Sequence, residues 1–152
     1  MKKLFLAMLV TCMLLAAFPV PANAAGYGDG NDIIWLDNGC YITIETYIYE
    51  SRAASTKSAS RNYTCTDSNG AELWKATLYG TFTYTGTTST CTASSCTVSI
   101  TNDAWYTISK TASKSGNTAT ADVVMGKKFL GIKIDEESVS MRLTCDANGN
   151  LS

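Results

Sequence analysis

The strongest constraint on the fold is a strict alternation of apolar and polar residues between Glu72 and Thr85. The apolar set is Trp74, Ala76, Leu78, Gly80, Phe82 and Tyr84, and the intervening set is Lys75, Thr77, Tyr79, Thr81, Thr83 and Thr85. Because successive side chains of a β-strand point to opposite sides, this period of two predicts a strand with one buried face. The run is long for a single strand, so we expect a bulge or bend near Gly80.

The same alternation recurs along most of the chain. Between Cys40 and Tyr49, one face carries Cys40, Ile42, Ile44 and Ile48, and the other carries Tyr41, Thr43, Glu45, Tyr47 and Tyr49. Further strands are expected at 33–36, 62–66, 97–101, 105–111, 118–125, 128–134 and 138–145, with turns at 67–70 and 115–117 and a loop or linker at 52–60. About eight short strands predict an all-β fold, an antiparallel, immunoglobulin-like β-sandwich that forms a single domain over residues 33–152.

Residues 1–24 have the layout of a secretory signal. A basic start at Lys2 and Lys3 precedes an apolar run from Leu4 to Phe18, and small residues close the segment. We expect a signal helix at 1–24, cleavage between Ala24 and Ala25, and a flexible lead-in at 25–32. The apolar run is too short for a membrane anchor, so no membrane span is expected after cleavage. Lipidation of Cys12 is the rival interpretation, but the preceding Thr11 fits it poorly. The protein is therefore expected to be secreted and extracellular.

Composition excludes several classes of function. The chain has no histidine, which rules out Ser-His-Asp and Cys-His nucleophile pairs and the common catalytic zinc sites. Removing Lys2 and Lys3 leaves ten basic against thirteen acidic residues, a net charge of −3. The positive charges are scattered, whereas nucleic-acid binding needs a basic stripe, so no nucleic-acid partner is expected. We predict no cofactor, no metal site and no catalytic residues.

Five cysteines follow the leader, namely Cys40, Cys65, Cys91, Cys96 and Cys145. In an exported chain, two disulfides and one leftover thiol are the simplest arrangement. The leftover cysteine is either free or cross-links two chains.

Three segments, Gly80–Cys91, Ser113–Thr120 and Leu143–Ser152, carry a resemblance to a known family. The chain resembles an uncharacterised family of small secreted β-rich proteins from anaerobic Gram-positive bacteria, filed as a domain of unknown function. The similarity covers most of the sequence after the leader. It implies export, a β-rich domain and a disulfide between Cys91 and Cys145, and it implies no activity. The other three cysteines are not matched, and Cys40–Cys65 is the first choice for a second bridge.

Four tyrosines, Tyr41, Tyr47, Tyr49 and Tyr79, lie on strand faces predicted to point toward solvent. Exposed aromatic rings can stack on sugars or form a protein interface, although tyrosine also simply suits strands. We therefore expect a binding or surface-interaction module whose partner is a cell-wall glycan or a surface protein.

Two other functions stay open. One is a structural or matrix component that self-associates through sheet edges or the odd cysteine. The other is a small carboxylate-dependent glycan hydrolase, which needs two acidic side chains in one cleft. The candidate carboxylates for such a pair are Glu45, Glu50, Glu72, Asp122, Asp135, Glu136 and Glu137.

Overall fold

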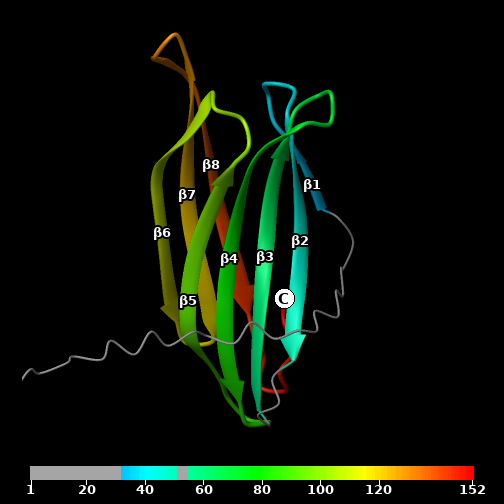
Figure 1. Ribbon diagram of the computed structural model, residues 1–152. Helices are drawn as coiled ribbons and strands as arrows, with labels where there is room; N and C mark the ends of the chain where they lie inside the picture. Colours follow the sequence, from blue (N-terminus) through cyan, green and yellow to red (C-terminus); the bar gives the residue numbers. More distant parts are fainter. Residues whose placement is uncertain (1–31, 51–54) are drawn as a thin grey trace, which may run out of the picture.

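The computed structural model describes residues 32–50 and 55–152, which form eight β-strands (Figure 1). The strands are β1 (Asp32–Trp35), β2 (Tyr41–Glu50), β3 (Thr56–Thr66), β4 (Glu72–Tyr84), β5 (Ser89–Ile100), β6 (Trp105–Ser115), β7 (Thr118–Phe129) and β8 (Ile132–Thr144). The predicted signal helix, its cleavage site and all of the lead-in except Asp32 lie outside the described residues. In the described part, no helix is long and apolar enough to cross a membrane.

The strands form two antiparallel sheets, which confirms the predicted all-β sandwich. The larger sheet has the order β1-β2-β3-β4-β5 and the smaller has the order β6-β7-β8. Every strand therefore pairs with its neighbour in sequence, and the chain passes from one sheet to the other only between β5 and β6. This order is an up-and-down meander, and no Greek-key crossover of the immunoglobulin type occurs among these eight strands.

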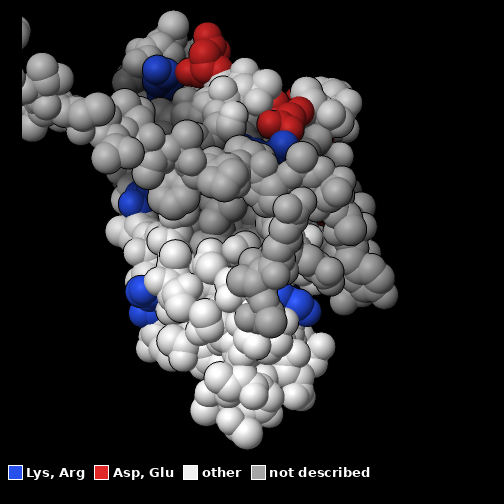
Figure 2. All heavy atoms as spheres, turned by 60° about the horizontal axis from the view of Figure 1, so that its bottom comes forward, with Lys and Arg blue, Asp and Glu red and all other residues white. Residues whose placement is uncertain are grey.

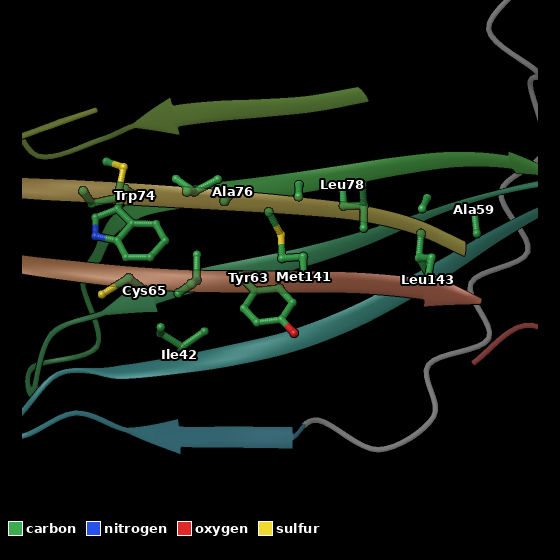
Figure 3. Close-up of a cluster of buried hydrophobic side chains, with 14 of the residues drawn as sticks. Ile42, Ala59, Tyr63, Cys65, Trp74, Ala76, Leu78, Met141 and Leu143 are labelled. Carbon is green, nitrogen blue, oxygen red and sulfur yellow. The ribbon is translucent and has the colours of Figure 1, made fainter. Parts of the chain in front are cut away.

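The core lies between the sheets and is built from the alternating apolar residues (Figure 3). Ile42, Cys65 and Trp74 are register partners on three adjacent strands, so they share the inner face of the larger sheet. The smaller sheet contributes Val123, Met125, Val139, Met141 and Leu143. The indoles of Trp74 and Trp105 meet across the interface, with ring centroids 6.1 Å apart. The predicted buried faces are therefore correct.

The expected irregularity in the long strand is present. The pairing of β4 with β5 shifts register between Thr81 and Phe82, directly after Gly80. Gly80 leaves room for a buried ring, because a Cβ at this position would lie 2.7 Å from Cε2 of Phe82. The glycine thus lets the Phe82 ring fold back against the backbone of its own strand.

Several predicted boundaries are wrong; β5, for example, begins at Ser89 and not at residue 97. Residues 52–60 were expected to form a loop, but β3 already begins at Thr56. A strand was also expected over 128–134, whereas β7 ends at Phe129 and β8 begins at Ile132. Leu130 and Gly131 form the two-residue turn between them, with φ of 50° and 80°. Such turns usually contain Asn-Gly, so the leucine concealed this one.

Candidate functional site

Three of the four predicted tyrosines gather on the outer face of the larger sheet. Tyr47 on β2 lies opposite Ser60 on β3, which in turn lies opposite Tyr79 on β4. Tyr49 occupies the next outward position on β2, one row further along. We call Tyr47, Tyr49 and Tyr79 the tyrosine cluster. They face outward because their sequence neighbours Ile48 and Leu78 occupy the inner face.

Hydrogen bonds orient two of these rings. The Tyr47 hydroxyl donates to Oε2 of Glu45 over 2.9 Å, and the Tyr49 hydroxyl lies 3.2 Å from Oγ of Ser60. The bond to the Glu45 carboxylate is also the main reason why the pKa of Tyr47 is raised. Ser60 is only 2% exposed beneath the rings, whereas Tyr79 is 42% exposed. The cluster is therefore a partly exposed aromatic surface that covers the buried Ser60, and hydrogen bonds hold two of its rings in place.

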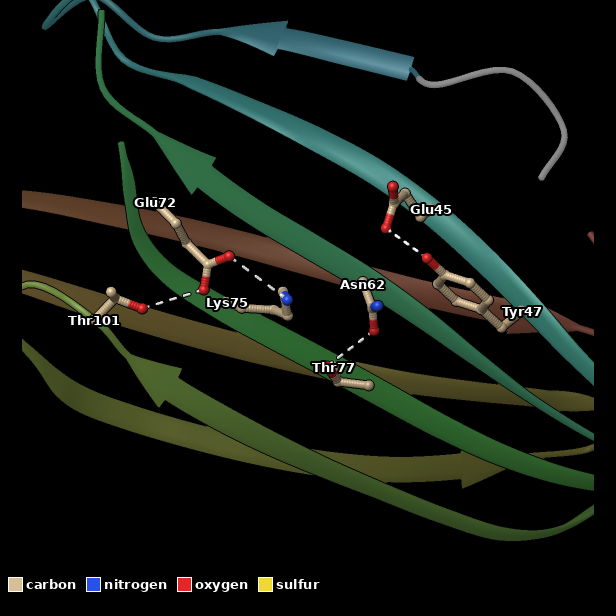
Figure 4. A network of polar contacts seen from close by, with 7 residues as sticks. All are labelled: Glu45, Tyr47, Asn62, Glu72, Lys75, Thr77 and Thr101. Carbon is tan, nitrogen blue, oxygen red and sulfur yellow. Dashed lines mark hydrogen bonds and ion pairs between the residues drawn. The ribbon is translucent and has the colours of Figure 1, made fainter. Parts of the chain in front are cut away.

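Small polar groups lie beside the cluster, and Figure 4 shows Asn62 and Thr77 together with Tyr47. The Thr77 hydroxyl donates to the side-chain oxygen of Asn62 over 2.9 Å, in the row next to Tyr47 and Tyr79. The hydroxyls of Ser58 and Thr81 are 3.1 Å apart in the row that holds Tyr49. These hydroxyl and amide groups supply donors and acceptors beside the rings. Among the described residues visible in Figure 2, charged side chains are scattered and form no large patch of one sign.

Tyr41 does not belong to the cluster. It lies six residues before Tyr47 on β2, about 20 Å away at the usual strand rise. Its ring instead contacts Trp35 on β1, with centroids 5.2 Å apart. Trp35 is 72% exposed, and sequence reasoning gave it no functional role. Only the pairing of β1 with β2 shows that it forms an aromatic pair with Tyr41.

Two of the candidate carboxylates converge on one amide. Nδ2 of Asn38, in the β1–β2 turn, donates to Oδ2 of Asp135 over 3.0 Å and to Oε1 of Glu137 over 2.9 Å. Burial, with Asp135 and Asp37 nearby, raises the pKa of Glu137. Because both carboxylates bind the amide, the arrangement attaches the β1–β2 turn of the larger sheet to β8 of the smaller sheet.

The remaining candidate carboxylates have separate partners. Glu45 accepts from Tyr47, Glu72 contacts Lys75 and Thr101, Asp122 accepts from Ser140, and Glu136 pairs with Lys133. The side chain of Glu50 lies outside the described part of the structure. In residues 32–50 and 55–152, no group of three or more His, Cys, Asp or Glu side chains could hold a metal ion.

The five cysteines are free thiols in the structure, so neither expected disulfide is formed in it. Cys65 nevertheless lies beside Cys40, because Cys65 pairs with Ile42 two residues further along the same face. Burial raises the pKa of Cys65 to about 12, and the neighbouring Cys40 thiol adds to this effect.

The other expected pair, Cys91 and Cys145, lies at the β6–β7 turn. The backbone N–H of Cys91 donates to the carbonyl of Gly116, and that of Cys145 donates to the carbonyl of Asn117. Burial raises the pKa of Cys91, and the nearby Cys145 thiol contributes. Cys96 is further along β5, where burial raises its pKa and Lys110 opposes the effect. The fold thus brings together both expected pairs and separates Cys96 from them.

Comparisons of the chain with protein-family models, with curated proteins and with solved structures found no match.

Proposed function

We propose that this protein is a secreted binding module that recognises a cell-wall glycan through the tyrosine cluster. The observation that supports the proposal is the register that places Tyr47 and Tyr79 on either side of Ser60. Aromatic faces bind the apolar sides of sugar rings, while neighbouring hydroxyl and amide groups bind the sugar hydroxyls.

The geometry favours a saccharide over a compact charged ligand. Tyr47 and Tyr79 are two strands apart, which separates their backbones by about 10 Å. Two rings at that spacing suit neighbouring units of a chain better than one small molecule. The hydroxyl anchors of Tyr47 and Tyr49 reduce the ordering cost of binding, because the rings are already oriented.

The test measures retention of the protein on insoluble peptidoglycan and on cellulose. Tyr79→Ala and Tyr47→Ala should each reduce retention by roughly tenfold, the equivalent of one lost stacking contact. Tyr41→Ala is the matched control, because Tyr41 lies on the same strand but outside the cluster. The proposal fails if the wild-type protein is not retained, or if Tyr41→Ala reduces retention as much as Tyr79→Ala does.

We also propose that export produces two disulfides, Cys40–Cys65 and Cys91–Cys145. In each pair, one thiolate attacks the disulfide of an oxidised dithiol oxidoreductase, and the second thiol then displaces that enzyme in its reduced form. The Cys91–Cys145 bridge would close a loop of about 54 residues and stabilise the fold by about 4 kcal/mol in the loop-entropy model. It would tie β5 of the larger sheet to the end of β8.

Peptide mapping of the exported protein under non-reducing conditions tests the two bridges. We expect one peptide pair that joins Cys91 to Cys145, another that joins Cys40 to Cys65, and an unlinked Cys96. Cys96→Ser should leave this map unchanged. An unlinked Cys145 in the wild-type protein would refute the Cys91–Cys145 bridge, and an unlinked Cys65 would refute the Cys40–Cys65 bridge.

The second candidate function is self-association, which the edge strand β1 supports. Ile33, Ile34 and Trp35 are 50%, 44% and 72% exposed on a strand whose outer edge pairs with no other described strand. Such an edge can pair with another chain. Sedimentation velocity under reducing conditions distinguishes the two functions, since a self-associating protein would form oligomers that Trp35→Lys weakens.

A further inference from the structure

We propose that the β7–β8 hairpin tip inserts into the surface of a lipid bilayer with anionic headgroups. The tip comprises Phe129, Leu130, Gly131 and Ile132, and the hairpin extends past the neighbouring strands at its end of the sandwich (Figure 1). This surface is distinct from the tyrosine cluster, which lies on the other sheet.

The tip exposes an unusual amount of apolar surface. Leu130 is 86% exposed, Ile132 70% and Phe129 64%, and Ile134 behind them is 57% exposed. Single exposed apolar residues are ordinary, but a contiguous group marks an interaction surface. Phe129 and Ile132 are register partners, so their side chains lie on the same face of the hairpin.

The backbone conformation at the apex also supports insertion of the tip into a bilayer. Leu130 adopts φ of 50°, in the left-handed region that disfavours a residue with a branched side chain, and Gly131 follows with φ of 80°. Asparagine tolerates this position far better and is the usual residue before glycine in such a turn. Leu130 is therefore unfavourable for the turn itself and is unfavourably exposed to water. A role in binding an apolar medium accounts for both costs.

The charges next to the tip favour a lipid surface over a protein groove. Lys128 and Lys133 are register partners directly behind Phe129 and Ile132, and both are exposed. Lysine side chains can keep their ammonium groups at phosphate level while their stems lie along apolar surface. Lys133 also pairs with Glu136 at 2.7 Å, so Lys128 is the cleaner probe of charge. The acidic residues of the hairpin, Asp135, Glu136 and Glu137, pair with residues 125–127 and lie further from the apex than Lys128 and Lys133. The order from the apex, apolar and then cationic, matches the order of acyl chains and anionic headgroups at a bilayer surface.

The experiment uses the full chain with vesicles of phosphatidylcholine alone or mixed with phosphatidylglycerol, and it measures amide hydrogen exchange across the hairpin. Protection of residues 127–134 by the mixed vesicles is the expected result. This readout is local to the hairpin, so binding of vesicles by another part of the chain does not produce it. Leu130→Asn should reduce the protection and raise the concentration of vesicles needed by roughly tenfold.

Two further variants and one measurement of stability complete the test. Lys128→Gln should weaken binding to the mixed vesicles and leave the residual binding to phosphatidylcholine unchanged. Ile108→Thr, which removes another exposed apolar residue on β6, should have no effect. Leu130→Asn should also be at least as stable to heat as wild type, which excludes misfolding as the cause of lost binding. The proposal is overturned if the mixed vesicles give the hairpin no protection. It is also overturned if Leu130→Asn binds like wild type, or if the hairpin is protected without vesicles in oligomers of the protein.

Discussion

Substituting Gly80 by alanine should destabilise the fold, because the new Cβ has no room. It would lie 2.7 Å from Cε2 and 2.8 Å from Cζ of Phe82, and 3.2 Å from Cβ of Ala119 on the opposite sheet. Phe82 is fully buried, so its ring cannot swing out into solvent to make room. Overpacking of this kind costs about 1–3 kcal/mol, and the loss of chain entropy in the unfolded state returns about 0.5–1 kcal/mol. We expect a net loss of about 1–2 kcal/mol.

Urea and thermal unfolding measure this loss. For a domain of this size, it corresponds to a decrease in Tm of about 4–8 °C. Gly126→Ala is the matched control, because its Cβ would approach the ring of Tyr106 at 2.6 Å. That ring is only partly buried and can rotate away, so the change in stability should stay within about 0.5 kcal/mol.

A double-mutant cycle with Phe82→Leu isolates the cause. Without the ring, Gly80→Ala should cost almost nothing, which gives a coupling energy of about 1 kcal/mol or more. The cycle remains informative even if Gly80→Ala alone fails to fold, because the double variant should regain structure. The reasoning is refuted if Gly80→Ala is as stable as wild type, or if it costs the same with and without the Phe82 ring.

Two other predictions concern ionisable groups. Because the folded state raises the pKa of Glu137, its protonated form favours folding, and that contribution is lost as the pH rises from the ordinary value of 4.5 through the raised one. Glu137→Gln should therefore raise Tm at pH 7 and flatten its pH dependence, whereas Glu136→Gln should not; a lower Tm for Glu137→Gln at pH 7 would contradict this. In the reduced, folded protein, alkylation at pH 8 should modify the partly exposed Cys96 before the fully buried Cys65, whose pKa is about 12. Mass mapping of the alkylated peptides checks the order, and early modification of Cys65 would contradict it.

The alternation of apolar and polar residues was enough to predict the fold class and most of the core. Side chains of a strand alternate between its two faces. Once one face is known to be buried, the sequence of that strand alone therefore shows which side chains are buried. This is why Ile42, Trp74 and Met141 were correctly placed inside. The bulge near Gly80 was also predictable, because a long strand with an internal glycine tends to bend there.

The Leu130–Gly131 turn was missed because its leucine lacks the usual turn chemistry. Turns normally contain residues such as Gly, Asn and Asp, which suit the backbone conformations of a turn. An apolar residue inside an alternating run therefore indicates a strand and not a turn. The start of β3 was missed for a related reason, since Thr56–Ser60 is polar except for Ala59 and has little apolar alternation of its own. Pairing with β2 and β4 supplies the hydrogen bonds that make this segment a strand.

By itself, the sequence determined the strand faces, the all-β class and the exclusion of histidine-based chemistry, because these depend on composition and on neighbouring residues. Only the tertiary structure decided that Tyr47, Tyr49 and Tyr79 lie together while Tyr41 lies apart, and that Cys91 and Cys145 both bond to the β6–β7 turn. Those relations depend on which strands pair and in which register. The physical reason is that register is set by the joint burial of all strands in one core, which no single segment of the sequence contains.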